Sequence, residues 1–177
     1  MISGVLGAST YGINAFVVTI ETHFTTKIPK QFSIVGLPDS AVKEARERVA
    51  AAIQNSGFYY PNRSITVNLA PADIRKEGSG FDLPIALGVI CEAGQLHPDM
   101  LDKYVFIGEL SLDGKIRPVR GVLPVAVDVR NRKLKGLIVP EENAREAAMV
   151  EGIDVHPRFS EDSVFLGLQI QLDAHLG

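Results

Sequence analysis

The stretch from Leu83 to Glu92 (LPIALGVICE) constrains the fold more than any other feature, because it predicts a helix with almost no polar face. Asp82 is the expected N-cap, and Pro84 falls in the first turn, where its missing N–H leaves no hydrogen bond unmade. A helix that is apolar nearly all round has to be covered on all sides. We therefore expect it to be buried between layers, with Cys91 as a small core residue.

Strands and helices alternate on both sides of this helix. The segment from Ser40 to Ser56 has apolar residues at helical spacing, and Asp39 or Ser40 can cap its start. Asp113 and Gly114 predict the turn of a β-hairpin. The order of elements predicts one α+β domain with a mixed β-sheet covered by helices. We expect strands at residues 15–21, 31–35, 64–69, 104–110, 115–118, 137–139 and 153–156, and further helices at 123–132, 141–150 and 160–168.

Composition excludes several classes of protein. An apolar fraction of 46 % and a charged fraction of 22 % are typical of a folded globular domain and exclude a disordered chain. No apolar run approaches the roughly 20 residues of a membrane helix. The first ten residues lack the basic segment of a signal peptide, so we expect a cytoplasmic protein with no membrane partner.

The residues that usually carry metal or nucleotide chemistry are sparse. Cys91 is the single cysteine and the four histidines are isolated, so we expect neither a disulfide nor a metal site. The sequence has no G-x-x-x-x-G-K-[ST] phosphate loop and no G-x-G-x-x-G after a strand. We therefore expect no cofactor in this chain and no nucleotide hydrolysis by the phosphate-loop route.

Charge is unevenly distributed along the chain. Between Lys115 and Lys135 there are seven basic residues and one acidic residue, a net charge of +6, whereas the whole chain carries −3 and the remainder therefore −9. Such asymmetry indicates either a charged binding face or only a solvated helix end plus a hairpin.

Three motifs are more specific than these patterns: residues 33–40 (SIVGLPDS), 68–87 (NLAPADIRKEGSGFDLPIAL) and 108–124 (GELSLDGKIRPVRGVLP). Over about residues 1–170 they resemble the N-terminal domain of the ComM/YifB family, often labelled magnesium-chelatase-like or ChlI-like. The resemblance implies the fold of the Lon proteolytic domain, which is also that of ribosomal protein S5 domain 2. It also implies that residues 171–177 begin a linker to an AAA+ ATPase domain, which would bind ATP and magnesium. The parent protein would be a DNA-stimulated homo-hexamer that acts in branch migration, as a helicase, during natural transformation or recombination.

The resemblance to Lon does not extend to its Ser-Lys catalytic dyad. In the matching loop, Lys76 to Gly80, the nucleophile position is Gly80, and the position of the activating lysine is Leu123. Arg120 is near this position in sequence, but a guanidinium stays protonated and cannot act as a base. The resemblance therefore predicts no catalytic residue in this chain, and residual Lon-type peptidase activity, through Ser79, is a minor alternative.

The loop from Arg75 to Asp82 leaves three interpretations open. It is a structural loop in which Gly78 and Gly80 adopt positive φ, or a phosphate contact made by Arg75, Lys76 and the following helix start. A kinase-like ligand site in the same place is the third interpretation.

The function that these features favour is a non-catalytic accessory domain that helps ring assembly and engages the DNA backbone without sequence specificity. The alternative is a pure assembly platform, in which the −9 and +6 regions of neighbouring subunits pair head-to-tail. The candidate DNA contacts are Arg75, Lys76, Lys115, Arg117, Arg120, Arg130, Arg132 and Lys133.

Overall fold

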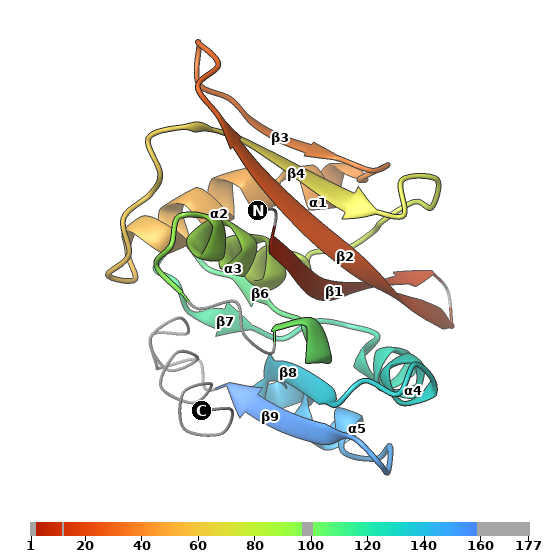
Figure 1. The fold of residues 1–177 in the computed structure, drawn as a ribbon. Helices are drawn as coiled ribbons and strands as arrows, with labels where there is room; N and C mark the ends of the chain where they lie inside the picture. Colours follow the sequence, from red (N-terminus) through yellow and green to blue (C-terminus); the bar gives the residue numbers. More distant parts are fainter. Residues whose placement is uncertain (1–2, 12, 97–100, 159–177) are drawn as a thin grey trace.

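The computed structural model describes residues 3–11, 13–96 and 101–158, and a seven-stranded sheet forms its centre (Figure 1). The strand order is β3-β4-β2-β1-β5-β8-β9; β2 runs antiparallel to both of its neighbours and the other pairs are parallel. The expected mixed sheet is thus confirmed. The strands are β1 (Ser3–Tyr11), β2 (Asn14–Thr25), β3 (Phe32–Val35), β4 (Ser64–Ala70), β5 (Tyr104–Phe106), β8 (Gly136–Pro140) and β9 (Asp154–Arg158), with β6 (Glu109–Leu110) and β7 (Ile116–Arg117) as a separate hairpin.

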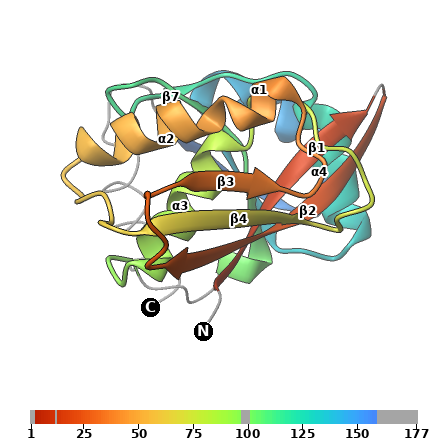
Figure 2. The same cartoon turned by 90° about the horizontal axis from the view of Figure 1, so that it is seen from above.

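Helices cover both faces of the sheet, as the expected architecture requires (Figures 1 and 2). Because successive strand residues point to opposite faces, Phe106 of β5 joins the apolar cluster under α2 and α3, and Val105 joins the cluster under α4 and α5. Residues 82–91 of α3 are all buried, which confirms that this helix lies inside the domain. The helices are α1 (Ser40–Lys43), α2 (Ala45–Gln54), α3 (Asp82–Glu92), α4 (Val122–Asn131) and α5 (Ala144–Ala147), with short 3-10 turns at Leu101–Lys103 and Glu141–Asn143.

Several element boundaries differ from the sequence-based expectation. The first strand, β1, was not expected, because glycine at positions 4 and 7 lowers its β-propensity. Gly7 allows close packing of α3, since a Cβ there would lie 3.0 Å from Pro84 Cγ. The helix expected at residues 40–56 is broken at Glu44, although Asp39 does cap its start by accepting a 2.7 Å hydrogen bond from Val42 N. The helix expected at 141–150 is confined to the short 3-10 turn and α5, and the one expected at 160–168 lies outside the described residues.

Asp82 has a different role from the one expected. It is the first helical residue of α3 and its side chain makes no capping bond. The fully buried carboxylate instead accepts hydrogen bonds from Arg48 Nε at 2.6 Å, from Arg48 Nη2 at 3.1 Å and from Leu110 N at 3.0 Å. Burial raises the pKa of Asp82, although the hydrogen bonds that it accepts act to lower it. The hydrogen bond to Asp82 raises the pKa of Arg48, which therefore stays charged. The pair ties α2, α3 and β6 together.

Cys91 is buried on α3, and desolvation raises the pKa of its thiol to about 12. Within residues 3–11, 13–96 and 101–158, no group of three His, Cys, Asp or Glu side chains is placed to hold a metal ion. None of the helices in these ranges is both long enough and apolar enough to cross a membrane.

Candidate functional site

The candidate site is a cleft of about 290 Å³ at the carboxyl ends of the parallel strands. Three loops meet there: residues 77–80 after β4, Ile107 after β5, and residues 118–120 after β7. The end of β1 contributes Ala8 and Thr10. Loops at the carboxyl ends of parallel strands are the common place for ligand sites in sheets of this kind.

Gly80 lies in this cleft, but Leu123 does not line it. A Cβ at Gly80 would point at Ile107 Cγ2, 3.3 Å away, and at Val119 Cγ1, 3.7 Å away. Leu123 lines a different hollow, together with Ile13 of the β1–β2 turn. The two positions that match the Lon dyad therefore belong to different cavities.

The starts of α3 and α4, which border the cleft, have few free N–H groups. The N–H of Leu83 donates to Gly108 O at 3.1 Å, and the N–H of Leu123 donates to Glu146 Oε1 at 3.1 Å. The next residue in each helix is a proline, which has no N–H to offer. At the start of α3 the N–H groups of Asp82 and Leu83 are therefore already bonded, which disfavours the phosphate-contact and kinase-like interpretations of this loop.

Lys76 holds the loop together and does not face solvent. Its ammonium is fully buried and donates to Gly36 O at 2.8 Å and to Pro71 O. Its backbone pairs with residues 37 and 39, through Lys76 N to Leu37 O and Asp39 N to Lys76 O, both at 3.0 Å. Burial lowers the pKa of Lys76. The structural interpretation of this loop holds in part: Gly78 has φ of +94°, but Gly80 is not in the positive-φ region and Asp82 does not cap α3. Lys76 is wrong as a DNA contact because the fold covers it.

The other seven basic candidates are exposed, but they do not form one face. Four candidates lie before the 77–80 loop or on and next to β7: Arg75, Lys115, Arg117 and Arg120. Of these, Arg120 lines the cleft. The other three lie at the carboxyl end of α4: Arg130, Arg132 and Lys133. The hairpin packs with the apolar cluster of α2 and α3 through Leu110 and Ile116, whereas α4 packs on the opposite face of the sheet. Figures 1 and 2 show β7 and α4 well separated. The +6 segment is thus continuous in sequence and divided in space.

Carboxylates neutralise some of these cations. Arg75 lies 3.3 Å from Glu77, Lys115 lies 3.9 Å from Asp113, and Arg132 lies 2.8 Å from Asp128. The remaining four candidates have no ion pair to any residue in the described ranges: Arg117, Arg120, Arg130 and Lys133.

Sequence reasoning missed two residues that shape the wall of the cleft. The Asn143 side chain makes two hydrogen bonds with the backbone of Val119: Oδ1 accepts from Val119 N at 3.0 Å, and Nδ2 donates to Val119 O at 2.8 Å. Glu146 accepts from the first turn of α4, as described above. Both follow Pro140 in a segment without a recognisable motif, so only their contact with residues 119–123 identifies their role.

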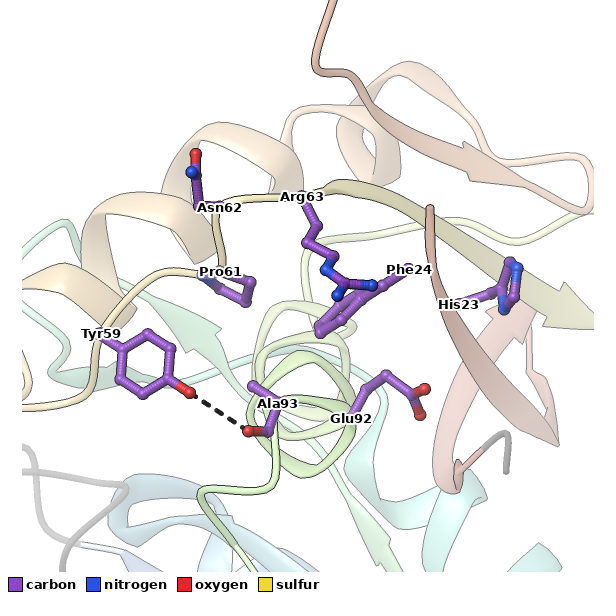
Figure 3. Close-up of a pocket in the computed structure, with 8 residues that line it drawn as sticks. All are labelled: His23, Phe24, Tyr59, Pro61, Asn62, Arg63, Glu92 and Ala93. Carbon is purple, nitrogen blue, oxygen red and sulfur yellow. Dashed lines mark hydrogen bonds between the residues drawn. The ribbon is translucent and has the colours of Figure 1, made fainter. Parts of the chain in front are cut away.

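A wider groove of about 580 Å³ opens at the other end of the sheet and holds none of the predicted site residues (Figure 3). Phe24 and Tyr59 supply aromatic surface, and Arg63 and Glu92 supply opposite charges. Tyr59 closes one side through its hydroxyl, which donates to Ala93 O at 3.4 Å. The groove lies outside the three motifs quoted above, so nothing in the sequence indicated it.

The chain is similar in sequence to a family of known proteins. Residues 20–143 match the family model described as subunit ChlI of Mg-chelatase. The chain is 44 % identical over 146 residues, 82 % of its length, to competence protein ComM of Haemophilus influenzae, and 43 % identical over 141 residues, 80 % of its length, to YifB of Escherichia coli. Each match spans 28 % of the relative. A weaker match, 26 % identity over 118 residues, covers 66 % of the chain and 21 % of Lon protease 2 of Bacillus subtilis, in agreement with a Lon-like fold.

Proposed function

Because the chain belongs to the family of the ChlI subunit of Mg-chelatase, we propose that it is a non-catalytic accessory domain of a ring-forming AAA+ ATPase and that it contacts DNA. Residues 1–170 would form this domain, and residues 171–177 would begin the linker to the ATPase. ATP and magnesium would bind in that ATPase domain, in a cytoplasmic homo-hexamer that moves DNA branches. The chain spans 28 % of its ComM and YifB relatives, so the activity of a whole protein is part of the proposal.

The observation that supports DNA contact is the set of four exposed cations without an ion pair in the described ranges. Arg117 and Arg120 lie beside the cleft, and Arg130 and Lys133 lie at the end of α4. When such side chains contact phosphates they release counterions, so the DNA affinity falls steeply as salt rises. In a ring of several copies, the phosphate contacts of each copy would add to the total DNA affinity. No aromatic side chain stands between them in sequence, which favours backbone contact over base stacking.

Charge reversal of each pair separately tests this proposal. We expect Arg117→Glu with Arg120→Glu, and Arg130→Glu with Lys133→Glu, each to lower duplex and branched DNA affinity about tenfold and the salt slope by about 2. Fluorescence anisotropy across a salt series measures both. Lys27→Glu with Arg63→Glu makes the same change of charge at exposed residues after β2 and before β4, away from both surfaces, and serves as the control. If affinity and salt slope are unaltered in both test variants, DNA contact by this domain is refuted.

The assembly platform is the second candidate, because large apolar side chains remain exposed. Ile13 is 89 % exposed on the β1–β2 turn, and Leu37 and Met149 are also exposed. If deleting residues 1–170 from the full-length ATPase abolishes its oligomer, while the isolated domain does not bind DNA, the platform becomes the better explanation. Mass measurement by light scattering distinguishes the two.

Peptidase chemistry is the least supported alternative. Ser79 lies in the cleft, where Glu77 and Arg120 are the charged side chains of the described lining. Since neither is a lysine or histidine base, we expect no labelling of Ser79 by a serine-reactive fluorophosphonate. Mass spectrometry of the labelled protein would detect it, with Ser79→Ala as the background control; stoichiometric labelling of Ser79 would contradict a non-catalytic role.

A further inference from the structure

One edge of the central sheet is open. β3 is the last strand of the sheet, and its ladder with β4 begins with Ile65 N donating to Gln31 O at 2.8 Å. In a parallel ladder this register directs the backbone groups of Ser33 and Val35 toward β4. The N–H and C=O groups of Phe32 and Ile34 therefore point away from the sheet. The one side-chain bond made to them in the described ranges is a long one, 3.4 Å, from Arg46 Nη1 to Phe32 O.

A groove of about 470 Å³ runs between this edge and helix α2. Phe32, Ala50 and Tyr60 give it an apolar and aromatic lining, and Arg46 and Glu47 also line it. Burial, followed by the charge of Glu47, raises the pKa of Tyr60 to about 12, so its phenol stays a neutral donor. An extended peptide beside β3 would direct every second side chain into this groove.

The surroundings of the groove favour an acidic occupant. Arg46 is held by carbonyl groups alone, with Nε donating to Lys43 O at 2.9 Å, so its charge is not neutralised. Lys30 donates to Asn62 Oδ1, which is uncharged, and Lys43 is exposed. The nearby Glu44 is turned toward Arg48, 3.7 Å away. Arg46 and Glu47 are thus the charged residues that line the groove in the described ranges, while Lys30 precedes Gln31 of the lining and Lys43 lies three residues before Arg46, so cations outnumber the unpaired carboxylate there.

We propose that β3 and α2 form a docking site for an extended acidic peptide segment of another protein. The segment adds a strand to the sheet through the outward-facing N–H and C=O groups of Phe32 and Ile34 and places a carboxylate on Arg46. Pairing of two copies of this chain through β3 is disfavoured, because it would bring the cations of both copies together. This site is on a different part of the surface from the proposed DNA contacts, and its test does not depend on them.

A labelled peptide tests the proposal directly. The probe is an acetylated eight-residue peptide of alternating valine and glutamate, titrated with the 177-residue chain by fluorescence anisotropy. We expect Arg46→Glu to weaken binding about tenfold, since it removes a charge-assisted hydrogen bond and adds repulsion. Arg145→Glu, an equal change at an exposed residue of α5, is expected to leave binding unchanged. Thermal melts of both variants check that the fold is retained.

Backbone methylation separates strand addition from simple charge attraction. In an extended peptide, alternate N–H groups face opposite sides, so two probes are N-methylated, one at the valines and one at the glutamates. We expect one of them to lose binding about tenfold or more and the other to keep it. Equal binding of both probes, an equal effect of Arg46→Glu and Arg145→Glu, no binding at about 1 mM protein, or dimerisation through β3 in place of peptide binding would each overturn the proposal.

Discussion

Replacing Asp82 by alanine is expected to lower the free energy of unfolding by about 3 kcal/mol, toward the lower end of the range for breaking a buried ion pair. The substitution removes three hydrogen bonds and leaves Arg48 charged without its partner. The Arg48 side chain is 21 % exposed, so water relieves part of this loss. Urea denaturation followed by circular dichroism measures the change.

Glu44→Ala is the matched control for Asp82→Ala. It removes another carboxylate near Arg48. The Glu44 side chain is 71 % exposed and its Oε2 lies 3.7 Å from Arg48 Nη1, so its loss is expected to cost less than about 1 kcal/mol. Equal destabilisation by the two substitutions would show that the Asp82 pair does not hold α2, α3 and β6 together.

Replacing Gly36 by alanine is expected to destabilise the domain by about 3 kcal/mol, through left-handed backbone strain and a steric clash. Gly36 has φ of +104°, and an added Cβ would overlap the carbonyl oxygen of Leu69. Moving the loop to relieve that overlap would also disturb Gly36 O, which accepts from the buried Lys76. Thermal unfolding by calorimetry measures the loss.

Gly57→Ala separates the clash from the strain. Gly57 has φ of +87°, but nothing lies within 4 Å of its added Cβ, so the expected cost is only the backbone strain of about 1–2 kcal/mol. If Gly36→Ala costs no more than Gly57→Ala, the close approach of residues 36 and 69 is not what fixes this loop.

Hydrogen bonds inside the fold hold the segments that border the cleft. The loop after β4 is held by Lys76, and the starts of α3 and α4 are bonded by Gly108 and Glu146. The N–H groups of Leu83 and Leu123 are therefore already used inside the fold. The exposed surfaces, rather than the cleft interior, are where we expect this domain to meet its partners.

Features that depend on neighbouring residues could be predicted from the sequence. The apolar run of α3, the cap at Asp39 and the turn at Asp113 and Gly114 all involve residues a few positions apart, and all are confirmed. The absence of a lysine and a serine at positions 123 and 80 is likewise a property of the sequence. Fold class followed from these local signals because the order of elements leaves few ways to cover an apolar helix.

Features that depend on partners in other elements of the fold could not be predicted from the sequence. Lys76 has the same side chain as any surface lysine, and carbonyls 40 and 5 residues away decide that it is buried. The position of Asp82 in the sequence predicts a helix cap, but its carboxylate is hydrogen-bonded to Arg48, 34 residues away. The sequence by itself determined most of the elements and the residues, Gly80 and Leu123, at the positions that match the Lon dyad. The tertiary structure alone decided which charges are buried, paired or free, and it divided the basic segment between two faces, because burial and pairing arise from packing between elements far apart in the chain.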